Sequence, residues 1–411
     1  MSFRMGCCRS IVLVLLFILS NETLVSADEH RLNFLRAYEI ETLSSSLDNP
    51  TSELRAYINV LRQTADSLTQ IRPWSVTYHR CPNPDIDPHD YYSESTYWWP
   101  DPTDPTAPYI RKDGIHNPDR FLKHKDDLNI LCKSVLLLSV AAYLFEEPKY
   151  AEKAEEFVRV WFIDPKTRMN PNAKYAQVIP NSDRKRGVGI LDTRRFVYLL
   201  EGVQVLKKAG YWDEKLEYGL QHWFSEYLDW MLESYYGIDE RERGNNHSTW
   251  YAVQLAAYAH YTGRLDIVED TWQYARKILL EEQIESDGKM PREMQRTRSL
   301  SYMIFNLDAW TLLSRMAELD GIGFWTLEND RGGSLAKSVA FVFPYLENPK
   351  KWHSKQIISY QLRERLFLIF GGLALQNPQM IDLYCSIMST DIIVNEVLLF
   401  FTNMMLVAGI L

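Results

Sequence analysis

Residues 126–162 read DDLNILCKSVLLLSVAAYLFEEPKYAEKAEEFVRVWF, and this stretch decides the fold. Apolar residues recur at spacings of three and four on both sides of Glu147-Pro148. That spacing is typical of helices with a buried face, and Pro interrupts a helix because it lacks the backbone donor. The stretch therefore predicts two helices, Asp126–Phe145 and Tyr150–Phe162, joined by a short loop.

The same pattern extends over most of the chain. It predicts further helices at Ser52–Thr69, Asp192–Ala209, Leu216–Tyr235, Thr249–Tyr261, Leu265–Glu282, Ser299–Leu319 and Ser334–Leu346. Helix pairs recur with short joining loops and without a strict sequence repeat, and alternating strands are few. We therefore expect an all-α protein, an α/α solenoid or a closed toroid built from helix pairs, over residues 28–349.

The first 27 residues have the composition of a secretory signal. Arg4 and Arg9 precede an apolar run over residues 11–19. Val25-Ser26-Ala27 offers small residues for cleavage. The run is shorter than the roughly 20 residues that cross a bilayer. We therefore expect a cleaved signal peptide at residues 1–27 and a secreted, extracellular protein (periplasmic if the source is bacterial).

Residues 350–411, the C-terminal segment, are apolar and divergent. Polar residues such as Asn395, Glu396 and Asn403 interrupt its last stretch, which favours a buried terminal helix over a membrane span. We therefore expect no stable insertion into a membrane.

The charge balance limits the partners. The 411 residues include 45 Lys and Arg against 54 Asp and Glu, a net charge of −9, and 46% are hydrophobic. Nucleic acid does not fit as a partner, because duplex binding needs a basic surface. No Cys-x-x-Cys or His-x-x-x-His pair suggests zinc. We expect no cofactor and a monomeric protein.

Two long stretches, residues 78–120 and 165–189, have no helical periodicity. Long loops inside a compact domain are uncommon and are usually functional. In a toroid they would line one mouth of the central cavity. We call them the aromatic loop and the polar loop, and we expect the functional site beside them.

The aromatic loop contains Tyr97-Trp98-Trp99 and, further on, Arg111. Neighbours in an extended loop point to opposite sides, so these rings do not all face one core. Flat aromatic faces suit sugar rings, and Arg111 suits a carboxylate. Aromatics that pin the loop to the body of the protein would explain the cluster equally well.

Two further motifs carry polar residues next to helices. Residues 240–250, ERERGNNHSTW, lead into a predicted helix, where Asn and Ser commonly act as caps and a His is either structural or catalytic. Residues 287–302, DGKMPREMQRTRSLSY, contain Arg296 and Tyr302, which are close enough to share one rim of a helix start. This arrangement favours either a solvated face or a pocket for an anionic substrate.

The ordered set of motifs resembles the alginate-lyase superfamily of polysaccharide lyases, including the lyases that cut glucuronan-type polymers. The resemblance covers roughly Tyr78 to Leu319. It implies an incomplete α/α toroid, an anionic polysaccharide as substrate, and cleavage of β-1,4-linked uronic-acid chains by β-elimination without a required metal.

The resemblance also implies the site residues. The catalytic residues would be Asn246, His247, Arg296 and Tyr302, and the substrate-binding residues would be Tyr97, Trp98, Trp99, Arg111, Asn181, Glu240 and Arg298. Tyr302 would be the general acid and also the base, unless His247 takes the latter role. An ordinary Tyr titrates near pH ~10, so Arg296 or Arg298 would help to ionise it. The spacing from Arg296 to Tyr302 fits the glucuronan-cleaving relatives better than the mannuronan-cleaving branch.

Two other classes stay open at this point. A glycoside hydrolase on the same architecture would need a carboxylate pair, drawn from Asp239, Glu240, Glu242 and Glu293. A carbohydrate-binding protein without catalysis would keep only the cleft.

Overall fold

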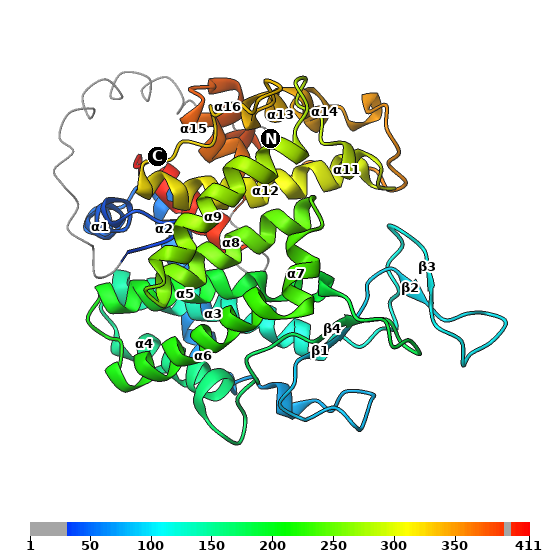
Figure 1. Ribbon diagram of the computed structural model, residues 1–411. Coiled ribbons are helices and arrows are strands. Elements are labelled where there is room, and N and C mark those ends of the chain that lie inside the picture. The colour runs from blue at the N-terminus through cyan, green and yellow to red at the C-terminus, as the bar shows by residue number, and fades with distance from the viewer. Residues whose placement is uncertain (1–30, 390–395) are drawn as a thin grey trace, which may run out of the picture.

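The computed structural model describes residues 31–389 and 396–411, so the predicted signal peptide lies outside the described residues. Its helices, labelled in Figure 1, are α1 (Ala37–Ser45), α2 (Ser52–Thr69), α3 (Lys123–Phe145), α4 (Pro148–Val158), α5 (Phe196–Lys208), α6 (Glu214–Glu233), α7 (Tyr235–Arg241), α8 (Asn246–Tyr261), α9 (Leu265–Tyr274), α10 (Leu280–Gln283), α11 (Pro291–Met294), α12 (Ser299–Ala317), α13 (Leu335–Val342), α14 (Pro344–Glu347), α15 (Gly372–Ala374), α16 (Pro378–Ile387) and α17 (Val397–Val407). Shorter 3-10 and π-helical turns are η2 (Val76–Tyr78), η3 (Arg159–Ile163), η4 (Gly187–Arg195), η5 (Ala275–Leu279), η6 (Glu318–Asp320), η7 (Pro349–Lys351) and η8 (Phe367–Gly371).

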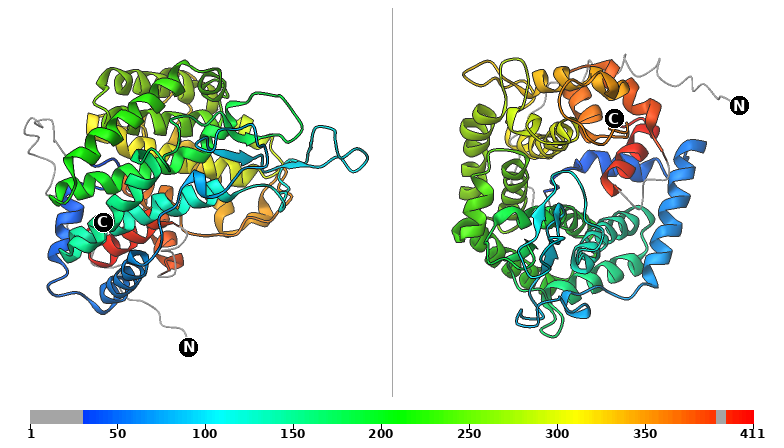
Figure 2. Two further views of the ribbon diagram at one scale, coloured as in Figure 1. Left: turned by 90° about the horizontal axis from the view of Figure 1, so that it is seen from below. Right: turned by 90° about the vertical axis from the view of Figure 1, so that its right-hand side faces the viewer.

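Four helices form an inner layer: α3, α5, α8 and α12. Each is buried on almost all sides, as expected of helices that are apolar or small around most of their circumference. Successive members pack on one another, α3 on α5, α5 on α8, and α8 on α12. The series follows a ring, seen end-on in the right panel of Figure 2.

The outer helices bury only one face. In α4 the buried side chains include Tyr150, Ala154 and Phe157, at the spacings that the sequence predicts. α2 and α4 cover α3, α6 and α9 cover α8, and α13 covers α12. The predicted α/α toroid, an all-α fold, is confirmed.

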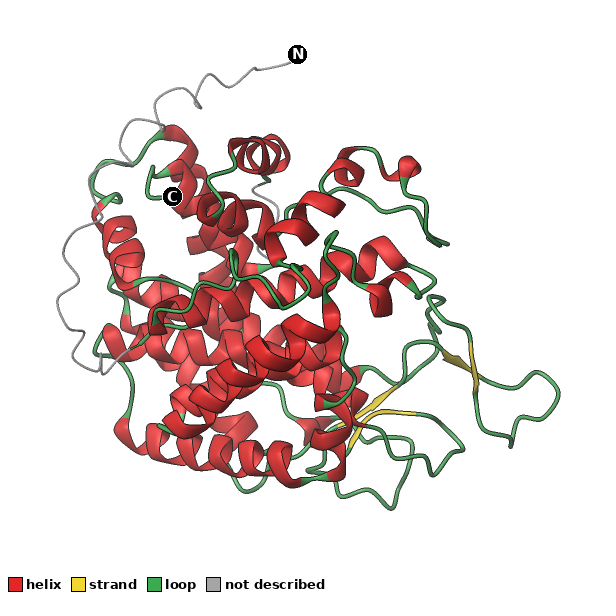
Figure 3. Ribbon diagram, turned by 45° about the horizontal axis from the view of Figure 1, so that its top comes forward, coloured by secondary structure: helices red, strands yellow, loops and turns green. Residues whose placement is uncertain are grey.

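The aromatic and polar loops meet at one end of the ring. Strand β1 (Tyr92–Glu94) of the first loop pairs in parallel with β4 (Tyr175–Val178) of the second. Within the aromatic loop, β2 (Trp98–Trp99) pairs antiparallel with β3 (Ile110–Arg111). Figure 3 shows these strands, in yellow, beside the helical body.

A buried carboxylate fixes the two loops to the ring. Asp192 in η4 accepts hydrogen bonds from Ser93 (2.6 Å) and Gln177 (2.8 Å), and it forms an ion pair with Lys125 of α3 (2.7 Å). Tyr91 also donates to it, at 3.2 Å. Tyr91 is fully buried, so this aromatic serves to hold the loop in place.

The described part of the C-terminal segment belongs to the same body. η8 and α16 pack on each other and η8 packs on α12, whereas α17 packs on α1, α2 and α3. α17 is buried, as predicted for a terminal helix. Among the described residues, only α3 is long and apolar enough to cross a membrane, and 72% of its most apolar window is buried inside the protein.

Candidate active site

A cavity of about 1270 Å³ opens beside the aromatic loop and runs along the inner helices. Eleven of its lining residues are Lys or Arg and four are Asp or Glu, although the whole chain carries a net charge of −9. The positive charge is therefore concentrated in the cavity, which suits a polyanion.

The start of α8 brings Asn246 and His247 to the cavity wall. Asn245 is the helix cap, and its side chain accepts from the backbone N–H of His247 at 3.1 Å. Gly244, at φ +63°, makes the turn before the cap, and a Cβ there would collide with the guanidinium of Arg292. The start of α8 thus contains both the predicted cap and the candidate catalytic residues Asn246 and His247.

A buried carboxylate orients His247. Glu240 of α7 is 1% exposed, and its Oε1 lies 2.6 Å from Nδ1 of His247. A carboxylate accepts but does not donate, so Nδ1 carries the hydrogen and Nε2 is left as an acceptor. Glu240 was expected to contact the substrate or orient the catalytic groups; it lies beneath His247 and does not line the cavity.

A second buried carboxylate orients Asn246. Glu293 of α11 accepts from the backbone N–H of Asn246 at 2.6 Å and from its Nδ2 at 2.9 Å. Burial raises the pKa of Glu293, although the Asn246 donors oppose this rise. Oδ1 of Asn246 is buried without a hydrogen-bond partner among the described residues.

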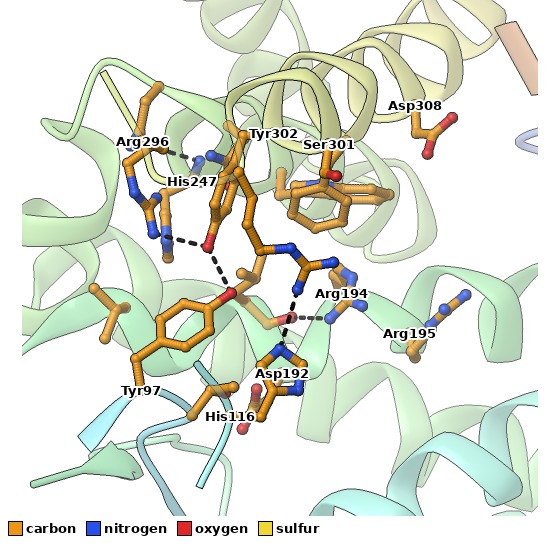
Figure 4. Close-up of a pocket in the computed structure, with 18 of the residues that line it drawn as sticks. Tyr97, His116, Asp192, Arg194, Arg195, His247, Arg296, Ser301, Tyr302 and Asp308 are labelled. Atoms are coloured by element: carbon orange, nitrogen blue, oxygen red, sulfur yellow. Dashed lines mark hydrogen bonds between the residues drawn. The ribbon is translucent and has the colours of Figure 1, made fainter. Parts of the chain in front are cut away.

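Tyr302, in the first turn of α12, lies between a cation and another phenol. Nη2 of Arg296 donates to its hydroxyl at 2.7 Å, and the hydroxyl of Tyr97 lies 2.6 Å away (Figure 4). Arg296 also stacks over the Tyr302 ring at 3.8 Å and binds Asp113 at 2.8 Å. Arg296 and Tyr302 thus share one rim, as predicted.

The surroundings of Tyr302 have opposing effects on its pKa, and Arg296 lowers it as expected. Burial raises the pKa of Tyr302 most, Tyr97 adds to the rise, and Arg296 opposes it without reversing it. Arg298 does not assist, since its guanidinium faces His116 at 3.4 Å. Tyr302 is therefore protonated at neutral pH and suited to donate a proton.

The predicted binding residues divide into two groups. Tyr97, Trp98, Arg111 and Arg298 line the cavity, whereas Trp99, Asn181 and Glu240 do not. Nδ2 of Asn181 donates to the carbonyls of Pro105 and Ala107, so it ties the polar loop to the aromatic loop. Trp99 donates to the carbonyl of Ile115 and is covered by Lys112.

Sequence reasoning missed several cavity residues, among them Arg186 and Arg194. Arg186 donates to Ser95 at 2.8 Å and lies over the ring of Trp98. Arg194 lies beside the rings of Trp250 in α8 and Phe305 in α12. Arg186 belongs to the polar loop and Arg194 to the start of the predicted helix Asp192–Ala209. Their positive charge was the only feature of the sequence that could have indicated a role in the site.

Three of the four carboxylates named for a hydrolase already have partners. Glu240 holds His247, Glu293 holds Asn246, and Asp239 binds Arg243. None of them lines the cavity. Among the described residues, no group of three or more His, Cys, Asp or Glu could hold a metal ion.

The chain is thus a helical toroid with a basic cavity lined by Asn, His, Arg and Tyr side chains. Solved structures agree with this fold. Alginate lyase A1-III from Sphingomonas species A1 is 15% identical and matches with a TM-score of 0.52 over 81% of this chain and 86% of that chain.

The family follows from closer matches. The family model described as Alginate lyase matches residues 75–352, and the chain therefore belongs to the alginate lyase family. The structure of an alginate lyase from Bacteroides ovatus is 31% identical, with a TM-score of 0.82 over 88% of this chain and 97% of that chain.

Curated relatives match over shorter stretches. The alginate lyase of Cobetia marina is 26% identical over 137 residues, and that of Pseudomonas syringae pv. syringae is 29% identical over 119 residues. These stretches cover 33% and 29% of this chain and 35% and 30% of the relatives, so the match spans about a third of their length.

Proposed function

We propose that the chain is a polysaccharide lyase that cleaves β-1,4-linked uronic-acid polymers, alginate among them, by β-elimination. One observation carries the proposal: a protonated Tyr302 is held by Arg296 at 2.7 Å in a cavity whose lining is strongly basic. The family membership and the names of its relatives support the same reaction class.

The reaction needs an acid, a base and groups that stabilise negative charge. A base removes the proton at C5, the electron pair forms the C4–C5 double bond, the C4–O4 bond breaks, and O4 receives a proton. The C5 proton is weakly acidic because the adjacent carboxylate is negative. Hydrogen-bond donors and cations near that carboxylate stabilise the negative charge that develops, and they therefore lower the barrier to removal of the C5 proton.

The side chains divide these roles. Tyr302 gives its proton to O4; burial raises its pKa and so keeps the hydroxyl protonated before the reaction. His247 accepts the C5 proton through Nε2, since Glu240 occupies Nδ1. Arg296, which lines the cavity, supplies positive charge to the uronate group, whereas both N–H groups of the Asn246 amide already donate to Glu293.

The same arrangement favours one stereochemistry. His247 and Tyr302 stand in the first turns of two adjacent inner helices, α8 and α12. C5–H and C4–O lie on the same face of the ring in mannuronate and glucuronate, and on opposite faces in guluronate. Acid and base on one wall suit the first two, so polymannuronate and glucuronan are the proposed preferred polymers.

A product assay tests the proposal. Purified protein is mixed with polymannuronate, polyguluronate, glucuronan and alginate, and the ultraviolet absorbance of the new C4–C5 double bond is followed. Absorbance is expected with polymannuronate or glucuronan, and Tyr302→Phe should lower turnover roughly 10²- to 10⁴-fold while still binding oligosaccharides.

Three outcomes would contradict the proposal. Reducing ends without absorbance would mean hydrolysis. Binding without any product would leave a carbohydrate-binding protein. Near-normal turnover by Tyr302→Phe would remove Tyr302 from the mechanism.

A further inference from the structure

The basic residues of the cavity differ in whether they already have an anionic partner. Three of the cations pair with carboxylates: Lys125 with Asp192 at 2.7 Å, Arg195 with Glu396 at 3.2 Å and Arg365 with Asp308 at 2.8 Å. Arg194 lines the same cavity but makes no ion pair with any described residue. Its charge is available to a ligand.

Arg194 is held in place without its charge being neutralised. Its Nη1 donates to the carbonyl of Leu191 at 2.7 Å, and its guanidinium lies 5.6 Å from the ring centres of both Trp250 and Phe305. Burial and the neighbouring Arg195 lower the pKa of Arg194 to about 10, which keeps it charged at neutral pH. Asp192 and Glu396 act on it only from beyond ion-pair distance.

The two rings give the position of Arg194 relative to the catalytic residues. Trp250 follows His247 by three positions in α8, and Phe305 follows Tyr302 by three positions in α12. Residues three apart lie on one face of a helix, about 4.5 Å apart along its axis. Arg194 therefore lies one helical turn deeper than the reacting groups, a step of the order of one sugar residue along the polymer. Figure 4 shows Arg194 and Arg195 on the opposite side of Tyr302 from Arg296.

The C-terminal segment contributes part of the cavity lining. Tyr360, Arg365, Glu396 and Leu399 of this segment line the cavity. The pairs Arg195–Glu396 and Arg365–Asp308 join that segment to the inner helices. These pairs match the charges of Arg195 and Arg365 within the protein.

We propose that Arg194 binds the carboxylate of the uronate residue next to the one that reacts. The inference rests on the proposed lyase function, because it assigns a substrate subsite for that reaction. A guanidinium that offers two N–H groups to a carboxylate is the strongest neutral-pH recognition that a side chain provides. Arg194 thus makes activity depend on two successive acidic sugars.

The test compares Arg194→Met and Arg194→Lys with Arg276→Met, an exposed arginine of η5 away from the cavity. The kinetics use oligosaccharides of the preferred uronate, lengthened by one residue at a time. In the wild type, kcat/KM should rise at the length that first reaches Arg194. At that length, kcat/KM of Arg194→Met should be roughly 10- to 100-fold lower than in the wild type, because KM is higher while kcat is nearly unchanged. Arg194→Lys should recover part of this loss, and Arg276→Met should match the wild type.

Two results would overturn the proposal: an Arg194→Met variant that gains from chain length as the wild type does, or one that loses kcat equally at every length. Binding separates this outcome from failure of the lyase function. In a Tyr302→Phe background, calorimetric titration with the longer oligosaccharide should show the same 10- to 100-fold loss for Arg194→Met even if no polymer is cleaved. Unchanged binding there would reject the subsite.

Discussion

Glu240 shows how a residue that never touches the cavity controls one that does. Its carboxylate, 1% exposed, fixes the hydrogen of His247 on Nδ1 and leaves Nε2 to accept a proton. The sequence offered Glu240 as half of a hydrolytic pair or as a substrate contact. The structure gives it a partner instead, because α7 ends directly before the turn that starts α8.

Glu240→Gln should therefore lower kcat with little change in KM. The amide can present its N–H₂ to Nδ1, which moves the imidazole hydrogen to Nε2 and blocks proton acceptance. We expect a loss of roughly 10²- to 10⁴-fold, the usual contribution of a general base. The matched control is Glu242→Gln, two residues away and exposed, which should behave as the wild type. Equal kcat for Glu240→Gln and the wild type would show that His247 is not the base.

At the level of elements, Asp192 connects the loops to the ring. Burial alone would raise its pKa, but Lys125 and the donors Ser93 and Gln177 outweigh burial and lower it. A carboxyl whose pKa is lower in the folded state stabilises the fold fully above its unfolded pKa. That contribution is lost as the pH falls below about 4, towards the folded value.

Asp192→Asn should cost about 3 kcal/mol or more of unfolding free energy near neutral pH, since it leaves Lys125 without its buried partner. As the pH is lowered into the acid range, the unfolding free energy of the variant should also fall less than that of the wild type. Chemical denaturation over a pH series measures both effects, and hydrogen exchange should report faster opening of β1 and β4. A variant with unchanged acid dependence would contradict this assignment.

The sequence predicted helices well where local signals mark their ends. α2 begins and ends where the apolar spacing indicated, because Thr51 caps it through Leu54 N–H. The predicted start at Asp192 was wrong for α5, since residues up to Arg195 form the 3-10 turn η4 around the buried Asp192 network. β1 and β4 could not be predicted, because their pairing joins segments about eighty residues apart and depends on tertiary contacts.

At the level of the whole molecule, the C-terminal segment is an integral part of the ring. Phe400 of α17 is fully buried and lies 5.3 Å, ring centre to ring centre, from Tyr57 of α2. Its apolar sequence favoured a buried helix, but no local pattern could name α1–α3 as the surface that it covers. Likewise, the sequence motifs predicted Asn246, His247, Arg296 and Tyr302 as site residues. Arg194 was identified only because it lines the cavity.

Phe400→Ala should lower the unfolding free energy by about 3–5 kcal/mol, as expected when a large core side chain leaves a cavity. Tyr218→Ala, at a 78% exposed position, should change it by less than about 0.5 kcal/mol. Denaturant titration compares the two variants. If Phe400→Ala were as mild as Tyr218→Ala, α17 would not be part of the cooperative fold.

The contacts of α17 also have a consequence for synthesis. Tyr57 meets Ser389 across 332 positions of the chain, and α17 packs on α1, α2 and α3. On the ribosome, the first helices therefore emerge long before the segment that shields their apolar face. Contacts so distant in sequence form slowly, and the uncovered face is open to aggregation in the meantime. Helices α1–α3 therefore gain this cover only late in translation.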